Sequence, residues 1–320
     1  MFKRVPTRDS GFKYNGQMRL SSQMPVVKHN QKPKHVAVGT RGPGAFTLVE
    51  LLVVIAVVAL LVAILVPALG RARRHAKAVA CMSNLRHWAQ IFGMYTGDSD
   101  GYFISEPAYR PDGSLVSGEH PEEKIWYTTL WQYHKDRKLY YCPLATKPED
   151  KSGRNPFSAW HHQGDELPDG WGFEDSSGAK HLYGSYGMNY WIRNWPSGRE
   201  DPASIQWLTY YWRNANVSGA DEIPLILDCQ WSGVEPTADA YPPEYDGQVS
   251  AEFEYCEEDM KRVCLNRQRN GMTNGAFMDF SVRRIGLKEL WDLRWHRHWS
   301  AEKLQVGPPQ WPPWMRNFKD

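Results

Sequence analysis

A long apolar run at residues 46–69 dominates the pattern of the chain. Its 24 residues contain one charged side chain, Glu50. At a rise of about 1.5 Å per residue, a helix of this length measures about 36 Å and can cross a bilayer core of roughly 30 Å. A secretory signal would have a shorter apolar core and a small-residue cleavage site after it, whereas here a basic stretch follows. The run therefore predicts a membrane-spanning helix that is retained.

The apolar pattern continues with the spacing of an amphipathic helix. Apolar residues recur every three or four positions, at Ala72, Ala76, Val79, Met82, Leu85, Ala89 and Phe92. Stop and turn signals follow at Gly93, Gly97, Asp98, Ser99, Asp100 and Gly101. One helix is predicted over residues 46–95, with its first half in a membrane or filament core and its second half packed on a domain at 96–320.

Shorter patterns in the C-terminal half predict strands and a late helix. Residues 276–278 and 281–285 are expected to form a hairpin, and residues 225–227 a buried strand. An aromatic stripe with a spacing of four is expected on a late helix that packs in the core, with a partner groove as the alternative: Leu287, Trp291, Trp295 and Trp299. The predicted fold is α+β, with a long N-terminal helix on a small antiparallel sheet that carries large loop insertions.

Charge is distributed unevenly along the chain. Residues 1–44 hold nine Lys or Arg and one Asp, a net charge of +8; the remainder holds 38 − 9 basic and 36 − 1 acidic residues, a net charge of −6. This predicts a basic cytoplasmic leader at 1–45 ahead of an exported domain, and no nucleic-acid partner. The positive-inside rule alone does not set the orientation, because residues 26–45 hold four Lys or Arg and residues 70–89 hold five.

The residues at the start of the apolar run form a motif. Arg41-Gly-Pro-Gly-Ala45 is followed directly by Phe-Thr-Leu-Val-Glu-Leu-Leu. This resembles the prepilin processing motif of type IV pilins and type II secretion pseudopilins. The resemblance implies that a prepilin peptidase cuts between Ala45 and Phe46 and that Phe46 becomes N-methylated. Family members usually have Gly where this chain has Ala45.

Glu50 and Pro67 are the candidate assembly residues. The family resemblance implies that Glu50 meets the N-terminal amine of a neighbouring pilin-like subunit, and that an inner-membrane assembly platform and membrane lipid are further partners. A carboxylate at the centre of a bilayer costs about 2.5 kcal/mol or more, and a paired ammonium would offset that cost. The alternative is a Glu50 side chain that snorkels to the interface. Pro67 is expected to kink or loosen the helix.

Further segments resemble a large bacterial branch with prepilin-type N termini and a C-terminal H-x9-DG signature. The resemblance lies in residues 81–86, 94–103, 141–143, 183–189, 227–231, 274–279 and 282–299. Asp279 is followed by Phe280 instead of Gly, so a different turn type is expected, because Phe adopts a positive φ less easily. Gln268 and Arg269 stand where the signature His is expected.

Five cysteines lie in the domain that is predicted to be extracytoplasmic: Cys81, Cys142, Cys229, Cys256 and Cys264. Disulfides can persist outside the cytoplasm, and the odd count leaves at least one thiol unpaired. The expected bridges are Cys81–Cys142 and, second, Cys229–Cys264. No close pair of Cys or His has finger-like spacing, so zinc is not expected.

Other chemistry-bearing patterns are few. Asp98 and Asp100 before Gly101 offer oxygens of the kind calcium prefers, but a solvated turn is the preferred interpretation, so no cofactor is expected apart from this calcium alternative. The motif His-Glu-x-x-His and a phosphate-binding glycine loop are missing from the sequence. No enzyme is expected.

Two functional hypotheses follow from these patterns. The first is a pseudopilin or pilin-like structural subunit, anchored by one span in the inner membrane with a periplasmic domain, in a type II secretion pseudopilus or a pilus-like filament. The second is an extracytoplasmic binding module or enzyme tethered by the prepilin helix, because the 13% aromatic content could line a glycan groove. Burial of the tryptophans favours the first hypothesis, and exposed rows of tryptophan favour the second.

Overall fold

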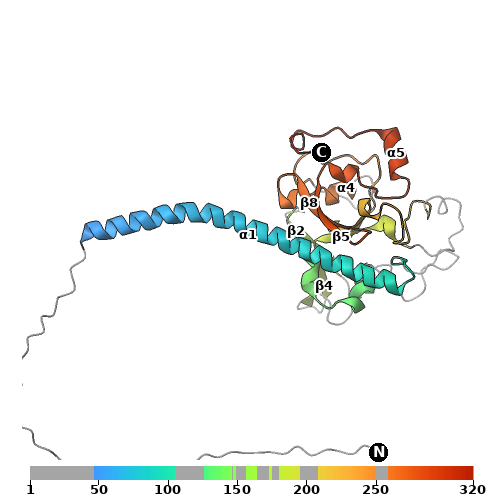
Figure 1. Ribbon diagram of the computed structural model, residues 1–320, viewed down its shortest axis with the longest axis horizontal. Helices are drawn as coiled ribbons and strands as arrows, with labels where there is room; N and C mark the ends of the chain where they lie inside the picture. Colours follow the sequence, from blue (N-terminus) through green and yellow to red (C-terminus); the bar gives the residue numbers. More distant parts are fainter. Residues whose placement is uncertain are drawn as a thin grey trace, which may run out of the picture. The chain divides into compact units, whose positions relative to one another are not determined.

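A computed structural model of the chain describes residues 47–105, 126–145, 147–148, 156–163, 173–174, 180–194, 208–248 and 259–319. The chain divides into two compact units, Met1–Val58 and Ala59–Asp320. The α-helices are α1 (Leu48–Asp98), α2 (Trp126–Thr129), α4 (Asp259–Val263) and α5 (Trp299–Val306) (Figure 1). The 3-10 helices are η2 (Leu130–Tyr133), η3 (Arg137–Tyr140), η4 (Tyr190–Ile192), η5 (Ala220–Glu222), η7 (Asn266–Gln268) and η8 (Glu289–Trp291).

The strands form two small sheets. The first has the order β1-β2-β4-β3, from Lys147–Pro148, Ser158–Gln163, Lys180–Gly184 and Phe173–Glu174. The second has the order β7-β5-β6-β8-β9, from Gly233–Val234, Tyr186–Asn189, Pro224–Asp228, Met272–Phe277 and Val282–Gly286. All pairings are antiparallel except β1 with β2 and β5 with β7. The predicted α+β class, with a long N-terminal helix and a small antiparallel sheet, is confirmed.

The predicted hairpin and buried strand are both present. The hairpin is β8–β9, with Ala276 opposite Val282, and the buried strand is β6, whose five residues are all buried. The expectation about Phe280 is wrong: it adopts φ +65°, the conformation that Gly favours at this turn. Two bonds close the turn, from Phe280 N–H to the Phe277 carbonyl and from Phe277 N–H to the Ser281 carbonyl, each 2.9 Å. The Phe280 ring also packs against the main core, which holds it there.

The second half of α1 packs into this core, but later than predicted. Its buried residues are Cys81, Leu85, Trp88, Ala89, Ile91, Phe92 and Thr96. Ala72, Ala76 and Val79 of the predicted stripe are exposed. Leu85, Ala89 and Phe92 of the stripe are buried, so the predicted face does pack, but only from Cys81 onward. The helix ends at Asp98, three residues beyond the prediction, where Gly101 at φ +83° donates its N–H to the Thr96 carbonyl.

The second sheet separates two cores. Met188, Ile226 and Ala276 face the core that includes α1. Leu227, Phe277 and Ile285 face a second core built with α4, Trp291, Trp295 and Trp299. Adjacent residues of β6 and β8 therefore serve opposite faces, as the two-residue period of a strand requires. The C-terminal aromatic residues cover the sheet on the face away from α1.

The predicted late helix at residues 287–299 is wrong, whereas the core packing of its stripe is confirmed. Leu287, Trp291, Trp295 and Trp299 are all buried, but only η8 and the first residue of α5 are helical there. The reason lies in the backbone: the Trp295 carbonyl accepts from Asn189 Nδ2 and Trp212 Nε1, each at 3.0 Å. These two side chains from distant segments occupy the carbonyl that a backbone N–H group of the next helical turn would otherwise bond.

Candidate functional site

The first turn of α1 holds Glu50 in a reciprocal cap with Thr47. Glu50 Oε2 accepts from the Thr47 backbone N–H at 2.9 Å and from the Thr47 hydroxyl at 2.8 Å. Thr47 Oγ1 in turn accepts from the Glu50 N–H at 3.2 Å. This is the geometry of a capping box, in which side chains satisfy N–H groups that the helix leaves open. Thr47 was not among the predicted residues, although the Thr-x-x-Glu spacing signals such a cap.

The cap leaves the Glu50 carboxylate exposed. The side chain forms no ion pair with any residue that the structure describes, and a carboxylate in a first turn interacts favourably with the helix dipole. A cation from another molecule can therefore still approach Glu50. The predicted processing residues, Ala45 and Phe46, lie outside the described residues, which begin at Thr47.

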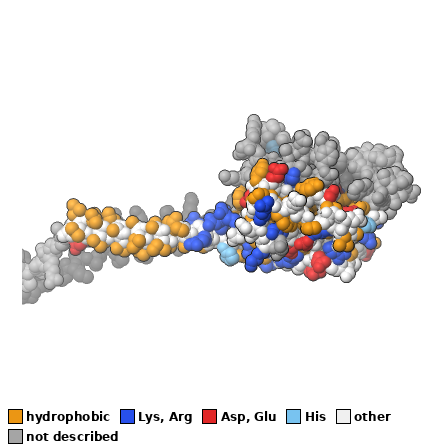
Figure 2. Space-filling view, turned by 90° about the horizontal axis from the view of Figure 1, so that it is seen from above, with side chains coloured by type: hydrophobic (Ala, Val, Ile, Leu, Met, Phe, Trp, Pro, Cys, Tyr) orange, Lys and Arg blue, Asp and Glu red, His pale blue; other side chains and the backbone are white. Residues whose placement is uncertain are grey.

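The described residues of the domain do not cover the apolar part of α1. An 18-residue window of α1 is long and apolar enough to cross a membrane, and none of that window is buried (Figure 2). Side chains from Leu48 to Leu69 are all exposed, so lipid or other subunits must cover them. Pro67 lies inside the continuous helix, where its missing N–H removes one backbone bond.

Asp98 and Asp100, the calcium alternative, lie at the end of α1. The Tyr133 hydroxyl donates to Asp98 Oδ2 at 2.9 Å. The Asp100 backbone takes φ +52°, and its carbonyl accepts from Asn214 Nδ2 at 3.3 Å. Both side chains are exposed, as in a solvated turn. Calcium binding here stays a prediction.

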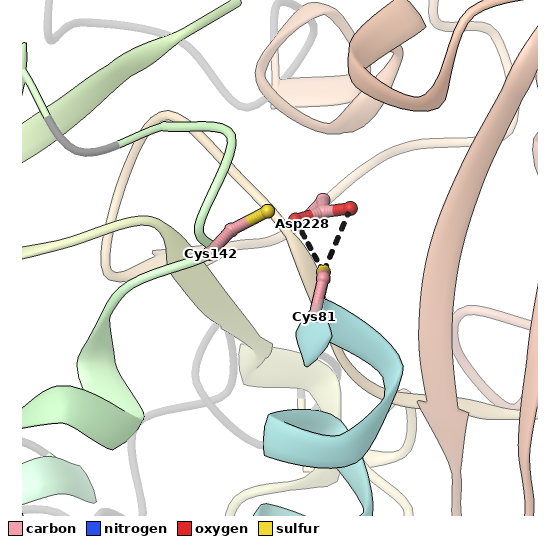
Figure 3. Close-up of side chains that lie close together, drawn as sticks. All are labelled: Cys81, Cys142 and Asp228. Atoms are coloured by element: carbon pink, nitrogen blue, oxygen red, sulfur yellow. Dashed lines mark hydrogen bonds between the residues drawn. The ribbon is translucent and has the colours of Figure 1, made fainter. Parts of the chain in front are cut away.

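Three chemistry-bearing side chains meet in the interior where α1 enters the domain. Cys81 comes from α1, Cys142 follows η3, and Asp228 ends β6 (Figure 3). Their ligand atoms all lie within 4.8 Å of one another, and all three residues are buried. The Cys81 thiol donates to Asp228 Oδ1 at 3.4 Å, and Asn274 Nδ2 donates to Cys81 Sγ at 3.4 Å.

Asp228 is neutralised by Arg267. The Arg267 guanidinium lies 3.4 Å from Asp228 Oδ1, and neither side chain is exposed. Arg267 also donates to four carbonyls from three segments of the chain: Pro156 and Ser158, Ser185, and Cys229. Gln268 Nε2 donates to Asp228 Oδ2 at 3.1 Å. The buried charge pair is thus fully hydrogen-bonded, which is the condition for tolerating charge in a core.

Burial keeps the Cys81 thiol protonated. Desolvation raises its pKa well above the ordinary value, and the hydrogen bond with Cys142 and the Asp228 carboxylate act in the same direction. A metal ion requires a deprotonated thiol, and Asp228 is already paired with Arg267. The cluster therefore fits a junction that fixes α1 to the sheet better than it fits a metal centre.

The four described cysteines are free thiols. Cys81 and Cys142, the first predicted pair, do lie together, but without a bond in this structure. Cys229 and Cys264 are both buried in the second core, and burial raises the pKa of Cys229 to about 12. Cys256 lies outside the described residues. Both disulfides stay predictions.

The described tryptophans are structural. Eight are buried, namely Trp88, Trp126, Trp160, Trp191, Trp212, Trp291, Trp295 and Trp299, and four are half-buried, namely Trp131, Trp231, Trp311 and Trp314. Each buried indole N–H donates to a backbone carbonyl, at 2.6 to 3.3 Å. Four of these carbonyls lie in loops, at Ser232, Pro236, Ala240 and Trp295, so these indoles hold loop backbone onto the cores. No exposed tryptophan row occurs among the described residues.

Comparison with known proteins finds a family match for one segment of the chain. A protein-family model described as a prokaryotic N-terminal methylation motif matches residues 41–66. No curated protein and no solved structure matches the chain at a significant level. The matched segment contains Ala45, Phe46, the Thr47–Glu50 cap and most of the apolar helix.

Proposed function

We propose that this chain, a type IV pilin-like protein of the prepilin type, is a pseudopilin-type structural subunit of a secretion pseudopilus or pilus-like filament. The observation that carries the proposal is the methylation motif at residues 41–66, placed directly on a helix whose apolar surface is wholly uncovered. A membrane anchor follows from the motif and this helix together.

Processing creates the assembly end. A prepilin peptidase cuts between Ala45 and Phe46, removes the basic leader on the cytoplasmic side, and leaves a methylated amine on Phe46. The domain from residue 96 onward then lies on the periplasmic side of the inner membrane, and the platform extracts subunits into the filament. There the apolar part of α1 exchanges lipid for the same part of neighbouring subunits.

Glu50 sets the register of that packing. The Thr47 cap orients the carboxylate at the helix start, and the Phe46 amine of a neighbour supplies the opposite charge. In a low-dielectric filament core, the pair is favourable only when both charges meet, so misregistered subunits would bury two unpaired charges.

The tethered-module alternative lacks a specific observation in its favour, because the described tryptophans are buried or half-buried. Within the described part of the chain, the buried indoles bond to backbone carbonyls and no row of exposed tryptophans offers a platform for a glycan. The proposed role is therefore structural.

Variants at Glu50 separate pairing from capping. Glu50→Gln keeps a side chain that can cap a helix but removes the charge, whereas Thr47→Val removes the cap hydroxyl and keeps the charge. In cells that contain the assembly machinery, E50Q is expected to insert into the membrane normally and to be absent from the filament fraction. T47V is expected to assemble.

Intact-mass analysis is the companion measurement. Protein co-expressed with a prepilin peptidase is expected to have the mass of residues 46–320 plus one methyl group. An uncut chain, or normal filament incorporation of E50Q, would count against the proposal.

A further inference from the structure

A pocket lined by cations opens beside α1 just after its apolar part ends. Its volume is about 470 Å³. Arg71 and Arg74 line it from α1, Arg269 lines it from the loop after η7, and Arg284 lines it from β9. Figure 2 shows Lys and Arg side chains gathered where the apolar surface of the helix stops.

The four arginines have no counter-charge among the residues that the structure describes. No carboxylate lines the pocket among the described residues, and none of the four arginines forms an ion pair within that part of the chain. Arg267, which also lines the pocket, is already paired with Asp228. All four side chains are exposed. Converging like charges repel, and an anion bound between them would relieve that repulsion.

The loop that presents Arg269 is held in an unusual conformation. Arg269 and Asn270 take φ +59° and +57°, which non-glycine residues rarely adopt. Asn266 fixes the loop, because its Oδ1 accepts from the Gly271 N–H at 3.0 Å and its carbonyl accepts from the Arg269 N–H at 3.1 Å. Such conformations persist where surroundings enforce them, and they concentrate at ligand sites.

The depth of the pocket matches the phosphate layer of a bilayer. Arg71 and Arg74 follow Leu69 by two and five residues, so they lie about 3 Å and about 8 Å further along the helix axis. The polar layer on each side of a bilayer is roughly 5 to 8 Å thick. Val79 and Met82, on the same helix face, give the pocket an apolar wall beyond the arginines.

We propose that this pocket binds the headgroup of an anionic phospholipid of the membrane that α1 crosses. Arg71 and Arg74 contact the lipid phosphate from the helix, and Arg269 and Arg284 contact it from the sheet. The bound lipid fixes the domain against the membrane surface. The site requires only that α1 crosses a membrane. A failure of filament assembly, or the opposite orientation of the chain, would therefore not contradict the lipid site.

The test uses the full-length protein in nanodiscs of phosphatidylcholine with a minor fraction of phosphatidylglycerol. Native mass spectrometry counts the lipids that each protein retains. Arg269→Gln with Arg284→Gln removes the sheet side of the pocket. Arg73→Gln with Lys77→Gln is the matched control, because it removes the same charge from α1 near the same depth but outside the pocket lining.

The wild-type protein is expected to retain phosphatidylglycerol in preference to phosphatidylcholine. R269Q/R284Q is expected to lower that preference about tenfold or more, because two charge-assisted contacts with the lipid phosphate are lost. The control R73Q/K77Q is expected to lower it several-fold less, because its side chains contribute only diffuse attraction to the membrane and do not converge on the headgroup. If R269Q/R284Q does not fold, Arg71→Gln with Arg74→Gln tests the same pocket from the helix side.

Three results would overturn the proposal. Equal losses in the two double variants would mean diffuse attraction by the basic helix. An absent lipid preference in the wild type would mean that the pocket binds no headgroup. Displacement of retained phosphatidylglycerol by inorganic phosphate or glycerol 3-phosphate would assign the pocket to a free phosphate compound instead.

Discussion

At the scale of single residues, burial decides the charge of His296. Its side chain is 1% exposed, and its Nδ1 has no hydrogen-bond partner among the described residues. Desolvation lowers its pKa to about 4, and the nearby His298 acts in the same direction. The unfolded chain takes up the proton near pH 6.5, so this stabilisation is present above about pH 6.5 and is lost as pH falls towards 4.

Replacing His296 tests this linkage. Between about pH 7 and about pH 4.5, the wild-type domain is expected to lose on the order of 2 kcal/mol of unfolding free energy through this group, and H296Q is not. Urea titrations of detergent-solubilised protein across that range measure the difference. The exposed His87 of α1 provides the control: H87Q is expected to keep the acid sensitivity of the wild type. Parallel pH profiles for wild type and H296Q would refute the assignment.

At the scale of elements, two glycines around the end of α1 have opposite roles. Gly93 lies inside the helix, and a Cβ added there would meet the Phe280 ring at 3.7 Å, an ordinary contact. G93A is therefore expected to stabilise the protein by up to about 1 kcal/mol through helix propensity. Gly101 has φ +83°, and a Cβ there would lie 2.7 Å from Asn216 Nδ2. G101A is expected to destabilise by about 1 kcal/mol or more.

Thermal unfolding of the two variants beside wild type measures both effects. The expected shifts of Tm are a few degrees and opposite in sign. Shifts of the same sign would mean that the helix end is not where the Gly101–Thr96 bond places it.

At the scale of the whole molecule, membrane attachment and folding use separate parts of α1. The apolar side chains before Gly70 are exposed, whereas burial in the domain starts at Cys81. A chain that begins at Arg71 is therefore expected to be soluble and monomeric without detergent, and to unfold at nearly the temperature of the full chain. Size-exclusion chromatography and circular dichroism measure this. A chain that begins at Leu48 is the control and is expected to aggregate without detergent. Aggregation of the shorter chain would show that the domain needs the apolar helix to fold.

The sequence by itself determined the features that depend on local pattern. Apolar length sets the membrane helix, and short runs of apolar and β-branched residues set the β8–β9 hairpin and the buried β6. The processing motif could be recognised because its residues are contiguous, and the Thr47–Glu50 cap could have been recognised for the same reason. Burial of Trp291, Trp295 and Trp299 followed from their hydrophobicity, whatever backbone carried them.

Only the tertiary structure decided features that join distant segments. The helix expected at 287–299 gives way to turns because Asn189 and Trp212 take the Trp295 carbonyl. Phe280 replaces Gly at a positive φ because core packing holds its ring. The meeting of Cys81, Cys142 and Asp228, and the convergence of Arg71 and Arg74 with Arg269 and Arg284, depend on how α1 lies against the second sheet. The helix and strand propensities of single residues do not include such contacts, because their energies arise only when the fold brings the partners together.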